Sequence, residues 1–134
     1  MADVHSTRTE LEKASTEHFK VYNRAPAEPS HQLLLFYAVE CGLKARYLAR
    51  ESLLSTSDFT SKLPGKKYGH GHKIMDWIAE LSIPASALSQ FAVDAAEPIL
   101  QLHEKLRYGV TLSPHCIQQV AYLYSIAEFM KSNP

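Results

Sequence analysis

The sequence has few cysteines, no long apolar run and no excess of charge of either sign. It contains two cysteines, Cys41 and Cys116, and each sits inside an apolar helical pattern. Reduced core thiols are therefore expected rather than a disulfide bridge. No stretch approaches the roughly 18 consecutive apolar residues of a membrane span. Residues 1–5 also lack the charged-then-apolar pattern of a signal peptide, so we expect a cytoplasmic protein without membrane contact.

The charges balance over the whole chain but not along it. Lysine and arginine together number 14, as do aspartate and glutamate, which argues against a generally basic nucleic-acid binder and against an acidic tail. Residues 43–73, however, carry seven basic and two acidic side chains, a local charge of +5. Such a region could steer an anionic partner to one side of the molecule, although solvated surface charge explains the asymmetry equally well.

The chain length and composition suit one globular domain covering residues 1–134. Hydrophobic residues make up 46% of the chain and charged residues 21%, as in soluble globular proteins. A chain of this length buries roughly two-thirds of its unfolded surface on folding, so its core needs neither a disulfide nor a metal.

Apolar residues recur at helical spacing in five segments, and no stretch alternates with strand period for long. The expected helices cover about 3–22, 30–51, 70–81, 84–106 and the stretch from 114 to the region of residue 130. The second is apolar nearly all round in its first half, which is typical of a central, buried helix. Residues 53–69 form a long irregular connection, and residues 82–84 a compact stop and restart before the fourth helix. The sequence therefore predicts an all-α, up-and-down bundle of about five helices.

Three short blocks carry a family resemblance. Residues 38–45 match the pattern A-x-E-x-x-L-K-A, which contains Glu40 and Lys44. Residues 71–74, Gly-His-Lys-Ile, are similar to a G-H-D-L block, and residues 107–108 form an Arg-Tyr pair after the penultimate long helix. With these blocks in this order, the chain resembles the HEPN family of small helical bundles, named for nucleotide binding in higher eukaryotes and prokaryotes.

The resemblance covers about residues 32–130, with two departures from the family pattern. Lys73 replaces the usual acidic residue, and Gly109 stands where a proline often follows the Arg-Tyr pair. The resemblance implies a HEPN-like accessory or binding module, often part of a microbial defence or toxin–antitoxin system. It also implies a homodimer or a nucleotidyltransferase-type protein partner, and a nucleotide or RNA phosphate as ligand. The candidate ligand-binding residues lie in the matched blocks: Glu40, Lys44, His72, Arg107 and Tyr108.

Many HEPN proteins are metal-independent ribonucleases whose motif is an arginine, usually followed by a polar residue, then four to six residues and a histidine. The histidine can move a proton from the ribose 2′-hydroxyl, and the arginine can stabilise charge on the phosphate. Arg24 and His31 have six residues between them but span a proline-rich connection. Arg107 and His115 have seven between them and lie near the end of the fourth helix and the start of the fifth.

A histidine at a helix N-terminus is a better neutral base than a cation, which suits the first step of this chemistry. A solvent-facing His115 without a catalytic role is the plainer interpretation. A ribonuclease that uses Arg107 and His115 is therefore the alternative function, and an all-α adaptor without a nucleic-acid role is another.

Two further patterns have structural as well as functional interpretations. Glu40 and Lys44 are four residues apart in the favourable order for a helical ion pair, and their place in the most apolar helix predicts a partly buried polar network reaching Arg107 or Tyr108. Residues 66–70, next to a helix N-terminus, could attract a phosphate.

His70 and His72 form an H-x-H pair, but no nearby cysteine or acidic cluster completes a zinc site. His103 and Cys116 are candidate ligands only if the bundle gathers them. We therefore expect neither a metal nor a cofactor.

Overall fold

The computed structural model describes residues 5–63, 69–70, 73–84, 88, 99–108 and 114–133. Its helices, in chain order, are α1 (Arg8–Arg24), α2 (Pro29–Arg50), the 3₁₀ turn η1 (Thr56–Asp58), α3 (Phe59–Lys62), α4 (Ile74–Glu80), α5 (Ile99–Arg107) and α6 (Pro114–Ser132). Over these residues there is no strand, and one isolated bridge joins Thr7 to Ser55. The predicted all-α bundle is thus confirmed for the described part of the chain.

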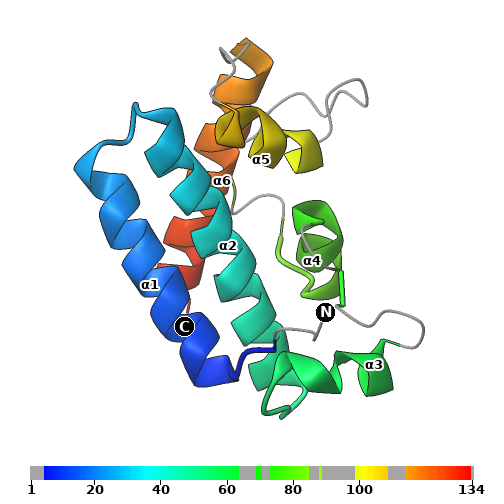
Figure 1. Ribbon diagram of the computed structural model, residues 1–134. Helices are drawn as coiled ribbons and strands as arrows, with labels where there is room; N and C mark the ends of the chain where they lie inside the picture. The colour runs from blue at the N-terminus through cyan, green and yellow to red at the C-terminus, as the bar shows by residue number, and fades with distance from the viewer. Residues whose placement is uncertain are drawn as a thin grey trace.

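The long helices lie side by side, with α2 in contact with both others (Figure 1). Helix α2 also packs against α4 and α5, so it is the common element of the bundle. Its side chains at Leu35, Val39, Leu43 and Leu48 are fully buried. The prediction that this helix is central is confirmed. A helix that is apolar on most sides can bury its side chains only where neighbouring helices cover most of its sides.

Helix α1 begins at Arg8, later than the sequence predicted, because Thr7 is extended and forms the bridge with Ser55. Thr7 caps the helix: its hydroxyl accepts from the Glu10 amide at 3.2 Å, and the Glu10 carboxylate accepts from the Thr7 amide at 2.8 Å. Thr56 donates its amide to the Ser6 carbonyl, which fixes this end of α1 to the segment after α2.

The predicted irregular connection over residues 53–69 was wrong in part, since it contains η1 and α3. Ser55 and Asp58 form a second capping box that starts these short helical turns. Of the predicted helix over 84–106, Ile99–Arg107 is helical, Pro84 and Leu88 lie outside a helix, and residues 85–87 and 89–98 are outside the described residues.

The side of α2 that faces α4 carries an aromatic cluster, which we define as Tyr47, Phe59 and Trp77. All three side chains are buried, and their ring centroids are 5.4–5.8 Å apart. Gly69 packs on this cluster with a φ of +62°, and a Cβ there would lie 2.8 Å from the Trp77 ring. The cluster therefore joins α2, α3 and α4 through aromatic contacts rather than through long helix interfaces.

No helix in the described ranges is long and apolar enough to cross a membrane. Cys41 is a free thiol, so it forms no bridge with Cys116, whose side chain is outside the described residues. Burial raises the pKa of the Cys41 thiol, and the neighbouring Glu40 carboxylate raises it further. Cys41 is therefore a protonated, partly buried thiol near neutral pH.

Candidate functional site

The predicted ion pair on α2 is present and largely buried. The Lys44 Nζ donates to Glu40 Oε1 at 3.0 Å, and the two side chains are 18% and 6% exposed, respectively. A buried carboxylate requires such a partner, because an unpaired charge away from water is strongly destabilising. The Lys44 ammonium in the middle of the central helix is therefore already paired with the Glu40 carboxylate.

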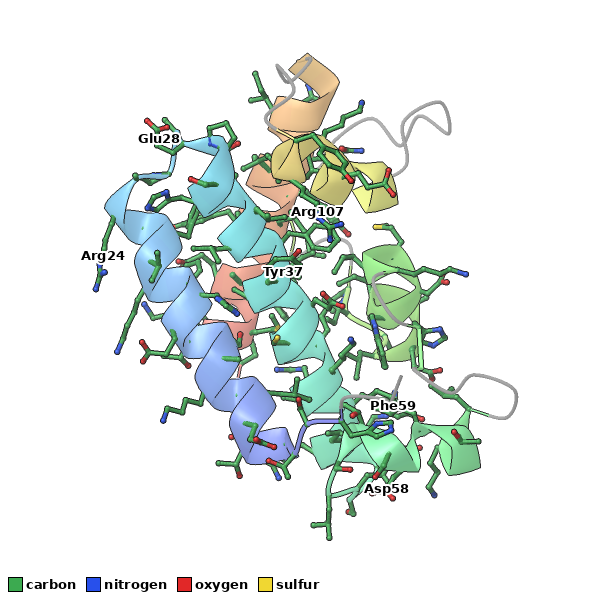
Figure 2. All side chains as sticks on the ribbon, in the orientation of Figure 1. Arg24, Glu28, Tyr37, Asp58, Phe59 and Arg107 are labelled. Atoms are coloured by element: carbon green, nitrogen blue, oxygen red, sulfur yellow. The ribbon has the colours of Figure 1, made fainter. Side chains whose placement is uncertain are left out.

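Arg107 extends from the end of α5 to α2. Its guanidinium is hydrogen-bonded to the hydroxyl of Tyr37 and, secondarily, to that of Tyr108, and these bonds raise the pKa of Arg107 above its already high ordinary value. Figure 2 shows Arg107 and Tyr37 next to each other where α5 meets α2. The side chain is thus a permanent cation at the surface, beside the phenol of Tyr37.

Helical spacing puts Tyr37 and the Glu40–Lys44 pair on one face of α2. Tyr37 lies three residues before Glu40, and Lys44 four residues after it, so the three side chains follow one another along the helix. Arg107 and Tyr108 add to the Tyr37 end of this row. We call these five residues the α2–α5 polar site: Tyr37, Glu40, Lys44, Arg107 and Tyr108.

The polar site combines a buried carboxylate with exposed groups. Glu40 is enclosed, whereas Arg107 lies at the surface and the Tyr108 ring is 73% exposed. A guanidinium in a fixed position suits bidentate binding of a phosphate or carboxylate. An exposed aromatic ring beside it offers a stacking surface for a planar group.

The other predicted site residues lie apart from this set or outside the described residues. His115 lies in the first turn of α6, as expected, but its side chain is outside the described residues, as is the whole of His72. Arg24 ends α1 and His31 lies in the first turn of α2, on two different helices. Figure 2 shows Arg24 pointing away from the bundle.

His70 is hydrogen-bonded to Glu80 and belongs to no metal site among the described residues. Its Nε2 lies 3.2 Å from Glu80 Oε1, and Arg50 binds the same carboxylate. In the part of the chain that the structure describes, no group of three or more histidine, cysteine, aspartate or glutamate side chains could hold a metal ion.

Sequence reasoning missed Tyr37 and Glu80, for different reasons. The sequence could have identified Tyr37, because its spacing from Glu40 places both residues on one helix face. Glu80 lies 30 residues from Arg50, and no local spacing rule connects positions so far apart.

Comparison of the chain with protein-family models, curated proteins and solved structures finds no match. Its function is therefore inferred from the geometry of its own residues.

Proposed function

We propose that the chain is a HEPN-like binding module that holds a phosphate group of a nucleotide or RNA at the α2–α5 polar site. The observation that supports this is the surface guanidinium of Arg107, fixed by Tyr37 of the central helix. A cation that is already oriented loses little side-chain freedom on binding, so more of the interaction energy contributes to affinity. As the partner of this module we propose a second copy of the chain or a nucleotidyltransferase-type protein.

The charges of the polar site favour a single phosphate over a long polyanion. Arg107 and Lys44 contribute two positive charges and Glu40 removes one, so the site carries a net charge of +1. Since the Lys44 ammonium is already bound to Glu40, Arg107 is the main group that faces an incoming anion. The exposed ring of Tyr108, next to it, can stack on the base attached to that phosphate.

Binding of a fluorescently labelled single-stranded oligoribonucleotide tests the proposal. Arg107→Gln removes the charge and the fork of donors, and we expect affinity to fall about 10- to 100-fold, since a hydrogen bond to a charged group is worth roughly 1.5–3 kcal/mol. Tyr37→Phe removes only the orienting hydroxyl, and we expect a smaller loss. Arg24→Gln removes an equivalent surface charge far from the polar site and serves as the matched control.

Salt dependence sharpens this experiment. Each phosphate neutralised on a single strand contributes about 0.7 to the slope of log affinity against log salt, so Arg107→Gln should reduce that slope by about 0.7. Equal affinities and equal slopes for the Arg107 and Arg24 variants would contradict the proposal. No measurable oligonucleotide binding by the unmodified protein would favour the adaptor function.

The ribonuclease alternative rests on the position of His115 at the start of α6, one connection after Arg107. It predicts cleavage of RNA in the presence of a chelator, with cleavage abolished by His115→Ala while oligonucleotide binding is retained. Binding without cleavage in the unmodified protein supports the binding module instead.

A further inference from the structure

The carboxylate of Glu80, the last residue of α4, is held from two sides. Its Oε1 lies 3.2 Å from the Nε2 of His70, and its Oε2 lies 3.3 Å from a guanidinium nitrogen of Arg50. Arg50 also donates to the backbone carbonyl of Glu80. One side chain thus connects the end of α2, the end of α4 and the segment that precedes α4.

The groups around Glu80 are themselves fixed by packing. The His70 side chain is 9% exposed, and its ring meets the Trp77 ring edge-on with centroids 4.8 Å apart. The Arg50 guanidinium lies over the Tyr47 ring, 5.0 Å from its centroid, and 3.5 Å from the carboxylate of Glu51. Among the described residues, His70 and Arg50 contact the Glu80 carboxylate, and Glu51 and Tyr47 lie against the Arg50 guanidinium.

Helix α4 depends on these contacts because it has little stability of its own. It is seven residues long, and the side chain of its N-cap residue, Lys73, makes no capping hydrogen bond. Isolated helices shorter than about 12–15 residues are marginal in water. Its last turn contains no basic residue, and a glutamate there opposes the helix dipole. Arg50 supplies from α2 the positive charge that the end of α4 lacks.

We propose that Glu80 is an acid-sensitive latch that holds the α4 segment, defined as Gly69, His70 and residues 73–84, against α2. When its carboxylate is protonated, the α4 segment opens while α1, α2 and α6 remain folded. This device does not depend on ligand binding at the α2–α5 polar site.

The direction of the pH effect follows from the contacts. The hydrogen bond with His70, and then those with Arg50, hold the pKa of Glu80 below its ordinary value of 4.5, although partial burial opposes them. A carboxyl group with a lowered pKa stabilises the closed state fully above that ordinary value. This contribution is lost as the pH falls through the pKa of the closed state.

The single tryptophan, Trp77, reports on the latch directly, because it lies against His70. In an acid titration of the unmodified protein, we expect the Trp77 emission to change and its quenching by acrylamide to increase at a higher pH than the loss of far-ultraviolet circular dichroism. Coincident transitions would overturn the proposal.

A pair of variants tests the latch at neutral pH. Glu80→Gln should speed amide hydrogen exchange over residues 77–81 about tenfold relative to the unmodified protein, with exchange in α1 and α2 unchanged. Glu51→Gln makes the same charge change next to Arg50 without touching α4, and should leave exchange in α4 unchanged. Equal effects of the two variants, or equal acceleration in α4 and α1, would overturn the proposal.

Discussion

The two sides of the central helix are held together in different ways. On one side, α1 and α6, of 17 and 19 residues, pack along the 22 residues of α2. On the other, α3 and α4 have four and seven residues and meet α2 through the aromatic cluster and Glu80 (Figure 1). We refer to these as the long-helix side and the short-helix side.

The difference shows how stability is distributed in a small bundle. A long interface sums many modest apolar contacts, so no single side chain decides whether the helix is present. A short helix has few contacts, and its presence depends on particular ones. We therefore expect the short-helix side to open locally at a lower free energy than the whole molecule.

The largest effect is expected for core truncations on the two sides. Leu123 in α6 and Ile74 in α4 are both fully buried aliphatic side chains. Leu123→Ala should lower the global free energy of unfolding by about 2–5 kcal/mol, the usual cost of such a cavity. Ile74→Ala should lower the global free energy of unfolding less. The substitution can reduce that free energy by no more than the local stability of the short-helix side. Denaturant unfolding measures the first quantity, and amide exchange in α4 measures the second.

The comparison fails if Ile74→Ala and Leu123→Ala shift the global denaturant midpoint equally without separating the exchange of α4 from that of α1. That result would mean that both sides unfold as one cooperative unit.

Substituting Gly69 or Gly42 by alanine should have an intermediate effect on stability, and the two glycines have contrasting surroundings. At Gly69, a Cβ would strike the rigid rings of Trp77 and Phe59, and the positive φ also disfavours any side chain. At Gly42, in α2, the Cβ would meet the flexible end of Met130 at 2.8 Å and the Ser15 hydroxyl at 3.0 Å. Gly69→Ala should therefore cost about 1–3 kcal/mol of local stability in α4.

Gly42→Ala should cost less than Gly69→Ala, because the Met130 terminus can move and alanine favours the helix by about 0.5–1 kcal/mol over glycine. Thermal unfolding and amide exchange compare the two variants. A larger loss from Gly42→Ala would show that the α2–α6 contact is the more rigid one.

The sequence was sufficient to predict features that depend on local spacing. The first half of α2, which is apolar nearly all round, predicted its central place, and four-residue spacing predicted the pair between Glu40 and Lys44. The turns η1 and α3 were missed although their signal was present, since Ser55 and Asp58 have the spacing of a capping box.

Features that depend on tertiary packing were beyond sequence reasoning. The contact of Arg107 with Tyr37 depends on how α5 crosses α2, and that of Arg50 with Glu80 joins residues 30 positions apart. Hydrophobic periodicity shows which face of a helix is buried, but not which neighbouring helix covers it. The sequence predicted that the polar network on α2 reaches Arg107 or Tyr108, but it did not identify Tyr37 as the residue of α2 that Arg107 contacts.

The smallest effect on stability is expected at the C-terminal ends of α2 and α4. Both helices end in the same motif, with serine at the position where glycine is usual. Ser52 and Ser82 have φ values of +55° and +53°. After each, the next amide donates to the carbonyl five residues earlier: Leu53 to Leu48, and Ile83 to Ile78. This is the Schellman motif, in which glycine avoids the strain that a side chain suffers in the left-handed region.

Replacing either serine by glycine should relieve about 1 kcal/mol of strain, less part of the entropy that glycine loses on folding. If the two sides open separately, Ser52→Gly raises the global free energy of unfolding, whereas Ser82→Gly mainly slows amide exchange in α4. Ser82→Ala keeps the strained side chain and should give no gain. A global gain from Ser82→Gly equal to that from Ser52→Gly would remove the distinction between the sides, because strain relieved in an independently opening segment cannot fully stabilise the rest of the molecule.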